Sequence, residues 1–186
     1  NICLGEKISS SVYSPSVQVY NCDTNNWSII PTIKEGVYIK EGVYDSCTTV
    51  VLNDVLYMLG EIYRGNEICA QAYDFRTGEW RILPSFQLEE FRFGDCCVHK
   101  GKIYVLNDCE NINSNINSAL SVFDPVAEKW SSALLKQGLI DDVGQRQLVS
   151  YRNELWMVKD ALNIVEIYND TASTVRKHDI SDLRDI

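Results

Sequence analysis

The stretch AQAYDFRTGEW, residues 70–80, decides the fold because variants of it occur three more times along the chain. They read VQVYNCDTNNW at 17–27, LSVFDPVAEKW at 120–130 and VEIYNDTASTV at 165–175. In each, an aromatic residue stands seven positions before the last residue. The leading aromatics are 53, 50 and 45 residues apart (73 − 20, 123 − 73 and 168 − 123). Repetition at a nearly fixed period predicts a repeat architecture.

A second series keeps the same register. It reads VLYMLGE at 55–61, KIYVLND at 102–108 and ELWMVKD at 154–160. Ahead of it stand short strand-like runs at 47–52, 95–99 and 147–151. A two-residue tip separates each of these runs from the following segment of the second series. The second residue of the tip (Asp54, Gly101 or Asn153) tolerates the positive φ of a tight hairpin. Each repeat is therefore predicted to form four short antiparallel strands.

The turn between the third and fourth strands has its own signature. An Asn or Asp follows each leading aromatic, and such a side chain accepts hydrogen bonds from the backbone of its own turn. Five residues past the aromatic stand Asn25, Gly78, Glu128 and Ser173. The first two suit a left-handed backbone, whereas Glu128 and Ser173 predict a different turn geometry.

Four-stranded units of about 50 residues are typical of propeller blades. Blades pack face to face, and large flat side chains fill the space between their sheets. We therefore predict an all-β fold of about four blades that form part of a propeller. Structural rather than ligand-binding roles fall to the residues of the repeat: Tyr20, Trp27, Tyr57, Tyr73, Asp74, Trp80, Tyr104, Phe123, Asp124, Trp130, Trp156 and Tyr168.

These residues make the chain resemble the kelch-repeat family over essentially its whole length. The resemblance rests on Tyr73-Asp74 with Trp80, on their counterparts in the other units, and on the strand IYVL at 103–106. Kelch repeats usually end the second strand with Gly-Gly. Here those positions read Gly-Glu at 60–61, Asn-Asp at 107–108 and Lys-Asp at 159–160, so the motif is degraded but remains in register.

The repeat boundaries predict a single kelch region over residues 1–186, with blades at about 1–31, 45–84, 93–134 and 145–178 and a charged tail at 179–186. ICLGE at 2–6 aligns with a second strand, so the first blade is expected to lack its first strand. The resemblance implies a six-bladed closed ring, which this length falls short of, although a four-bladed ring is an alternative. An open arc of blades, unlike a closed ring, would expose its terminal blade faces and allow self-association.

Composition excludes several classes of protein. Lys plus Arg is 17 against 26 Asp plus Glu, and the net charge of −9 argues against nucleic acid or an anionic membrane as the main partner.

Seven scattered cysteines without C-x-x-C spacing predict reduced thiols in a cytoplasmic protein. Some kelch-type propellers resemble copper oxidases, but the two histidines, His99 and His178, cannot supply the paired-His set. We expect no metal, no cofactor and no catalytic residue. The adjacent Cys96 and Cys97 are expected to be buried structural residues, because a strand sends neighbouring side chains to opposite faces; a redox-active pair is the alternative.

The resemblance places the binding residues on rim loops. These are the loops between second and third strands and the connections between blades, where we single out Tyr63, Arg64, Arg92, Phe93, Asn111, Asn113, Asp142 and Arg146. Arg92 and Arg146 occupy nearly equivalent places and could bind carboxylates of a partner. Ion pairs with acids of this chain are the alternative. The connection at 31–44 carries KEGVY twice, at 34–38 and 40–44, which indicates an elongated loop of unknown role. An extra hairpin over the rim is the alternative, because Val and Tyr favour strands.

The resemblance implies a protein-interaction module. In BTB-kelch proteins the propeller captures a target, and a separate BTB domain, which this sequence does not contain, engages a cullin ubiquitin ligase. The alternative is a cytoskeletal organiser that binds actin filaments. An acidic chain facing acidic actin would need a basic patch, and the sequence shows none that is obvious.

Overall fold

The computed structural model describes residues 2–4, 17–21, 24–30, 47–61, 67–87, 91–109, 116–136, 146–159, 164–169 and 174–179. The chain forms two compact units, Asn1–Tyr38 and Ile39–Ile186. The segments at 34–44, Tyr63, Arg64, Asn111, Asn113, Asp142, Ser173 and the tail at 180–186 lie outside the described residues. Within the described residues, no helix is long and apolar enough to span a membrane.

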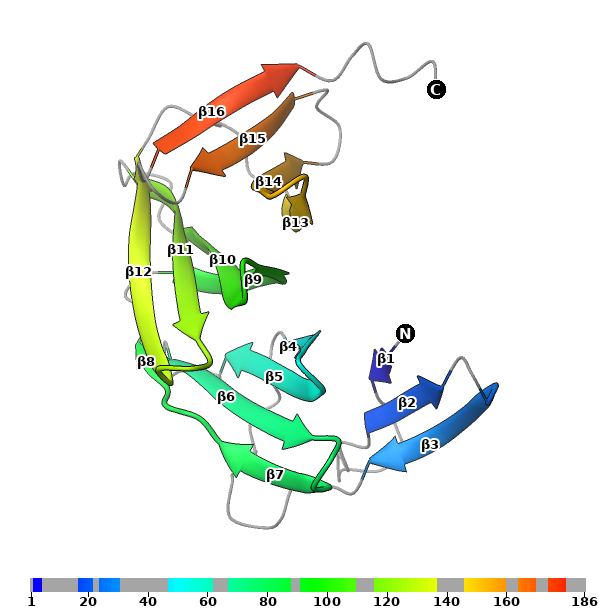
Figure 1. The fold of residues 1–186 in the computed structure, drawn as a ribbon. Coiled ribbons are helices and arrows are strands. Elements are labelled where there is room, and N and C mark those ends of the chain that lie inside the picture. Colours follow the sequence, from blue (N-terminus) through cyan, green and yellow to red (C-terminus); the bar gives the residue numbers. More distant parts are fainter. Residues whose placement is uncertain are drawn as a thin grey trace, which may run out of the picture. The chain divides into compact units, whose positions relative to one another are not determined.

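The first unit contains one three-stranded sheet, which we call sheet A. It consists of β1 (Ile2–Leu4), β2 (Val17–Asn21) and β3 (Asn26–Ile30), in the order β1-β2-β3 (Figure 1). β1 pairs antiparallel with β2, as a second strand would. The rings of Tyr20 and Trp27 lie directly opposite each other with centroids 5.1 Å apart, so the repeat aromatics form a cross-strand pair.

The second unit contains three antiparallel sheets, called B, C and D, each built in chain order (Figure 1). Sheet B consists of β4 (Cys47–Leu52), β5 (Val55–Glu61), β6 (Glu67–Asp74), β7 (Glu79–Ile82) and β8 (Phe86–Gln87), which pairs with β6 beyond β7. Sheet C consists of β9 (Phe91–His99), β10 (Lys102–Cys109), β11 (Ile116–Asp124) and β12 (Lys129–Lys136). Sheet D consists of β13 (Arg146–Tyr151), β14 (Glu154–Lys159), β15 (Ile164–Asn169) and β16 (Thr174–Asp179). The predicted all-β fold with propeller-type blades is confirmed.

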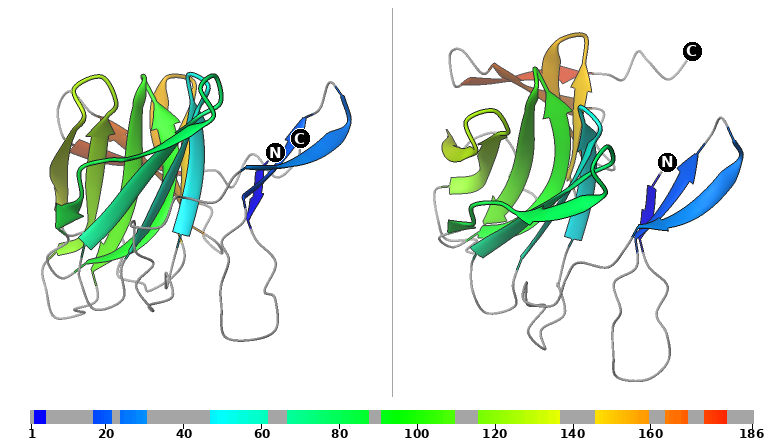
Figure 2. Two further views of the ribbon diagram at one scale, coloured as in Figure 1. Left: turned by 90° about the horizontal axis from the view of Figure 1, so that it is seen from below. Right: turned by 60° about the horizontal axis from the view of Figure 1, so that its bottom comes forward.

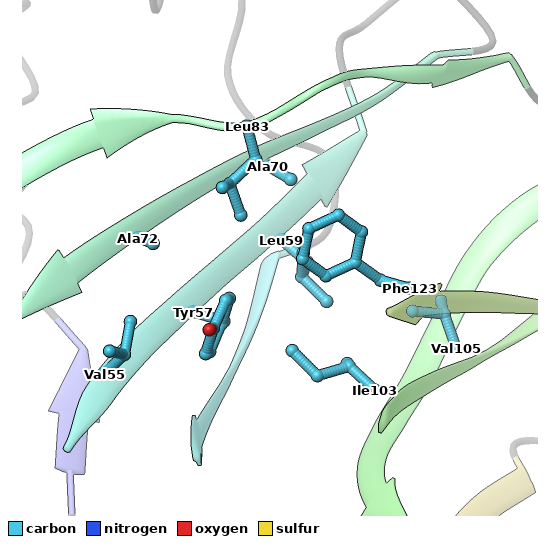
Figure 3. Packing of buried hydrophobic residues seen from close by; sticks show 9 residues of the cluster. All are labelled: Val55, Tyr57, Leu59, Ala70, Ala72, Leu83, Ile103, Val105 and Phe123. Carbon is cyan, nitrogen blue, oxygen red and sulfur yellow. The ribbon is translucent and has the colours of Figure 1, made fainter. Parts of the chain in front are cut away.

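The apolar core of this unit lies between neighbouring sheets. Tyr57, Leu59 and Ala72 of sheet B pack with Ile103, Val105 and Phe123 of sheet C (Figure 3). On the other face of sheet C, a second cluster contains Tyr104, Leu106, Leu120, Leu148, Leu155, Met157 and Tyr168. Alternating side chains of β10 thus enter different clusters, because successive residues of a strand point to opposite faces. Sheet C is the layer shared by both interfaces.

The adjacent cysteines follow the same alternation. Cys96 packs against the cluster between sheets B and C, and Cys97 packs against the cluster between sheets C and D. Both are free thiols. The predicted division of the pair between opposite faces is therefore confirmed, but both thiols are half-buried rather than fully buried.

Candidate functional site

The inner strands of the second unit position everything that follows. β9 lies beside both β4 and β13, so the first strands of sheets B, C and D are neighbours (Figure 1). These strands run in the same direction, since each occupies the same place in its repeat. One end of the row therefore carries the residues that begin β4, β9 and β13, and the other end carries the hairpins that leave them. A partner could bind at either end.

Two polar contacts fix β9 against β13. Asp95 of β9 accepts a hydrogen bond from the backbone N–H of Leu148 through Oδ2 at 2.8 Å, and from that of Cys96 through Oδ1 at 2.8 Å. His99 Nδ1 lies 2.8 Å from Ser150 Oγ, and its ring stands edge-on to Tyr104. The His99 side chain is buried, so this hydrogen bond satisfies a polar group inside the interface. No contact between sheets was predicted for Asp95, His99 or Ser150, although Asp95 and His99 stand at the two ends of a predicted strand.

We expect Asp95→Ala to lower the free energy of unfolding by about 2–3 kcal/mol, because it leaves the two N–H groups at the interface without their acceptor. Asp95→Asn should lose less, since its amide oxygen still accepts one bond. Chemical denaturation monitored by tryptophan fluorescence measures both variants. Equal losses in the two variants would contradict this role of the Asp95 side chain.

At the end of the row where β4, β9 and β13 begin, which we call the entry end, the predicted arginines lie on strands. Arg92 and Phe93 lie inside β9, in register with Asp108 and Asn107 of β10, rather than in a connection ahead of the strand. Arg146 begins β13 and is in register with Lys159 of β14. The reason for the difference is that β10 continues to Cys109, beyond a register shift after Val105, and pairs with the earlier part of β9. Arg92 and Arg146 thus lie at equivalent ends of neighbouring strands. Tyr63, Arg64, Asn111, Asn113 and Asp142 are outside the described residues.

A buried asparagine replaces the kelch glycine at this end of sheet C. Asn107 has no exposed surface, and its Nδ2 donates a hydrogen bond of 2.7 Å to Ser121 Oγ of the neighbouring strand. This bond satisfies the amide nitrogen of Asn107, whereas its Oδ1 is buried without a hydrogen-bond partner. The sequence shows that this position departs from the family pattern, but it contains no signal that Ser121 would be the hydrogen-bond partner of Asn107.

At the opposite end, the hairpin tips have left-handed backbones at both positions. The φ angles are 52° and 59° at Asn53-Asp54, 48° and 73° at Lys100-Gly101, and 46° and 64° at Arg152-Asn153. Positive φ at both central residues defines the turn that matches the twist of paired strands. The sequence predicted this backbone for the second residue of each tip. It gave no sign of the first, where Lys100 and Arg152 carry bulky side chains.

The turns between third and fourth strands carry the predicted carboxylate hydrogen bonds. Asp74 Oδ1 accepts from the N–H of Arg76 at 2.8 Å, and Asp124 Oδ1 accepts from those of Val126 and Ala127 at 3.0 and 3.1 Å. The Arg76 side chain holds the pKa of Asp74 below its ordinary value, and the Ala127 N–H does the same for the pKa of Asp124. The predicted turn role of these two acids is confirmed.

Glu128 corrects one expectation. Its φ is 50°, so it adopts the left-handed backbone that the sequence analysis reserved for Asn25 and Gly78, whose φ angles are 53° and 71°. The turn has the same geometry as its counterparts, so the fifth position past the aromatic is left-handed even where a glutamate stands there. Glu128 also forms an ion pair with Arg81 of β7. Trp130 Nε1 donates to the Pro84 carbonyl 2.7 Å away in the same region.

The described residues contain no group of three or more His, Cys, Asp and Glu side chains placed to bind a metal. Burial, with a smaller contribution from the Asp95 carboxylate, raises the pKa of Cys97 to about 12. A thiol with a raised pKa is a poor nucleophile at neutral pH.

The proteins to which this chain is similar in sequence are kelch proteins, in agreement with the repeat described above. No protein-family model matches the chain. The chain is 34% identical over 164 residues to kelch repeat protein M-T9 of Myxoma virus, which covers 87% of this chain and 29% of that protein. It is 28% identical over 123 residues to kelch-like protein terF of Aspergillus terreus, covering 62% of this chain and 26% of that protein. Human kelch-like protein 23 is 25% identical over 114 residues, covering 61% of this chain and 18% of that protein. The chain thus spans less than a third of the length of these relatives.

Solved structures show the same architecture at low sequence identity. Apo AztD from Citrobacter koseri superposes with a TM-score of 0.54 at 13% identity, covering 90% of this chain and 42% of that one. A mutant of the GH43 protein BlXynB from Bacillus licheniformis has a TM-score of 0.53 at 11% identity, covering 75% of this chain and 32% of that one. At these identities the likeness concerns the fold alone.

Proposed function

The chain belongs to the kelch-repeat family, and on that premise we propose that it recognises the substrate of a BTB-kelch cullin-RING ubiquitin ligase in the cytoplasm. Kelch propellers generally bind proteins. Engagement of the cullin would fall to a BTB domain outside these 186 residues, and this chain would contribute binding without catalysis. Similarity to relatives named kelch-like proteins supports this assignment over an actin-binding role.

One observation carries the proposal: Arg92 and Arg146 lie at equivalent ends of the neighbouring strands β9 and β13. Guanidinium groups bind carboxylates through two parallel hydrogen bonds, so a pair of them suits an acidic segment of a protein substrate. The chain as a whole carries a net charge of −9, which makes a local pair of arginines selective for its partner's acids rather than for anions in general.

We expect Arg92→Ala with Arg146→Ala to reduce partner capture by roughly tenfold or more, without lowering the melting temperature. The experiment expresses the chain with an affinity tag, identifies captured proteins by mass spectrometry, and then measures the ubiquitination and half-life of each candidate substrate. A matched control replaces Lys129 and Lys177, exposed lysines on β12 and β16, by alanine. This control removes the same charge elsewhere and should leave capture unchanged.

Three results would contradict the proposal. One is recovery of actin filaments as the captured partner, which would favour the cytoskeletal alternative. Another is a captured partner whose ubiquitination is the same with the parent chain and with the double arginine variant. The third is a lowered melting temperature in the double arginine variant, which would make both residues structural and assign their charges to acids of this chain.

A further inference from the structure

The contacts between sheets of the second unit repeat, so each face of a sheet has a defined role. Sheet C lies between sheets B and D (Figure 1, Figure 2). Sheet B contacts sheet C through Tyr57 of its second strand, and sheet C contacts sheet D through the equivalent Tyr104. The sheet that is contacted presents its leading aromatic, Phe123 in the first interface and Tyr168 in the second. We call the side with the second-strand aromatic the forward face, and the side with the leading aromatic the rear face.

The forward face of sheet D is more exposed than its counterparts. Its second-strand aromatic, Trp156, lies opposite Val149 of β13, so the two side chains share this face. Trp156 is half-buried and Val149 is 42% exposed, whereas the equivalent aromatics Tyr57 and Tyr104 are buried. Tyr151, two residues beyond Val149 and therefore on the same face, is also exposed. The side chains that fill an interface in sheets B and C thus reach solvent in sheet D.

The exposed part of this face is its β13 side. Val165 and Ile167 of β15 share the face through their pairing with β14, and both are buried. Val149 stands three residues before its hairpin tip, as Val50 and Cys97 do, and those two pack against the clusters between the sheets. Neither apolar cluster of the second unit includes a described residue of the forward face of sheet D. The repeat therefore builds a contact face here that neither cluster completes.

Sheet A has an exposed rear face. Its leading aromatic, Tyr20, lies opposite Trp27, and Ile29 stands two residues further along β3, so the three side chains share one face. Tyr20 is half-buried, while Trp27 is 53% and Ile29 is 68% exposed. In sheet C the equivalent Phe123 is fully buried, and Trp130 packs against the same cluster with sheet B. One chain thus carries both halves of a contact between sheets, and both reach solvent.

We propose that this chain associates with a second copy of itself, in which the forward face of sheet D binds the rear face of sheet A. The second copy is the occupant that fits, because it carries the leading aromatic and Trp that sheet C presents to sheet B. Trp156 packs on Tyr20 of the second copy, as Tyr57 packs on Phe123 with 6.2 Å between the ring centroids. The contact joins two different faces and is therefore heterologous.

Apolar contact drives this association, and charge opposes it. The side chains named on both faces are aliphatic or aromatic, and their burial is favourable. Each copy carries a net charge of −9, so two copies repel each other, and salt screens that repulsion. Association should strengthen as the salt concentration rises, which is the opposite of a contact held by ion pairs. The contact uses neither Arg92 nor Arg146, so it goes beyond the proposed function and does not depend on it.

Two variants each block one face. Val149→Lys places a charge on the forward face of sheet D, and Ile29→Lys places one on the rear face of sheet A. Sedimentation velocity over a range of concentrations measures the mass. We expect the parent chain to associate as its concentration rises, and each variant alone to associate at least tenfold more weakly, because an unpaired charge in an apolar contact is costly. Mixed in equal amounts, the two variants should form a heterodimer, since each retains the face that the other has lost.

The matched control is Val126→Lys, which adds the same charge to a turn residue of sheet C that is 94% exposed. It should associate as the parent chain does. Melting temperatures measured at the lowest concentration should be the same for the parent chain and all three variants, because the replaced side chains are exposed. Arg92→Ala with Arg146→Ala should also leave association unchanged, so failure of the proposed function and failure of this contact can be told apart.

Several results would overturn the inference. A parent chain that keeps the 21.2 kDa mass of one copy at every concentration would show that these faces bind no second copy. Association of either blocked variant at the strength of the parent chain would place the contact elsewhere. A mixture of the two variants that stays monomeric would exclude the pairing of sheet D with sheet A. Equal weakening by Val126→Lys would show an effect of net charge alone, and association that weakens with salt would show a contact held by ion pairs.

Discussion

Phe123→Ala is expected to lower the free energy of unfolding by about 3–5 kcal/mol, which is the range for removing a fully buried aromatic ring. Phe123 has no exposed surface and belongs to the cluster between sheets B and C (Figure 3). Its ring lies 6.2 Å from that of Tyr57 and 5.0 Å from that of Trp130, measured between centroids. Alanine would remove the contacts with both rings. It would also leave a cavity between sheets B and C, which the two sheets cannot fully close.

Urea unfolding followed by circular dichroism measures this loss. Val126→Ala provides the control, because Val126 lies three residues further along the chain with 94% of its surface exposed, and its truncation should change stability by less than about 0.5 kcal/mol. A loss below about 1 kcal/mol in Phe123→Ala would contradict the assignment of this cluster as the core.

Alkylation of Cys97 in the folded chain is expected to be roughly a hundred to a thousand times slower than in the unfolded chain at pH 8, because the thiolate is the reactive species. The pKa of Cys97 is raised from 9.0 to about 12, mainly by burial, so the folded state keeps the thiol protonated. Iodoacetamide labelling with peptide-level mass spectrometry measures the rate, and the same reaction in denaturant supplies the reference. Labelling of folded Cys97 at the reference rate would place it outside the interface.

The raised pKa also fixes the direction of a pH effect. Between about pH 9 and 12 the unfolded chain has lost the thiol proton and the folded chain retains it. The unfolded state then binds fewer protons, so the contribution of Cys97 to the free energy of unfolding falls as the pH rises through this window. Cys97→Ala should remove that part of the alkaline decline.

Much of the fold could be predicted from local patterns. The spacing of Tyr73 and Trp80 recurs because both residues belong to one hairpin, whose strands place them directly opposite each other. The division of Cys96 and Cys97 between two interfaces follows from strand alternation alone. Asp74 and Asp124 bond within their own turns, so three or four residues of sequence contain the whole interaction.

The features that escaped prediction depend on residues far apart in sequence. Glu128 pairs with Arg81, which is 47 positions away, and Asp95 accepts a hydrogen bond from the N–H of Leu148, which is 53 positions away. Arg92 was expected in a connection because the extension of β9 depends on how far β10 continues past its register shift. Of the predicted binding residues, only Arg92, Phe93 and Arg146 fall on described strands, and their role in binding stays a prediction.

Pro84 has a consequence for the solubility of the chain. It interrupts the outer edge of sheet B between β7 and β8, and its carbonyl accepts a hydrogen bond from the indole N–H of Trp130. Proline has no N–H to donate, so this point of the edge offers neither of the groups with which a strand from another molecule would pair. The residue that breaks the strand thereby also protects sheet B against edge-to-edge aggregation.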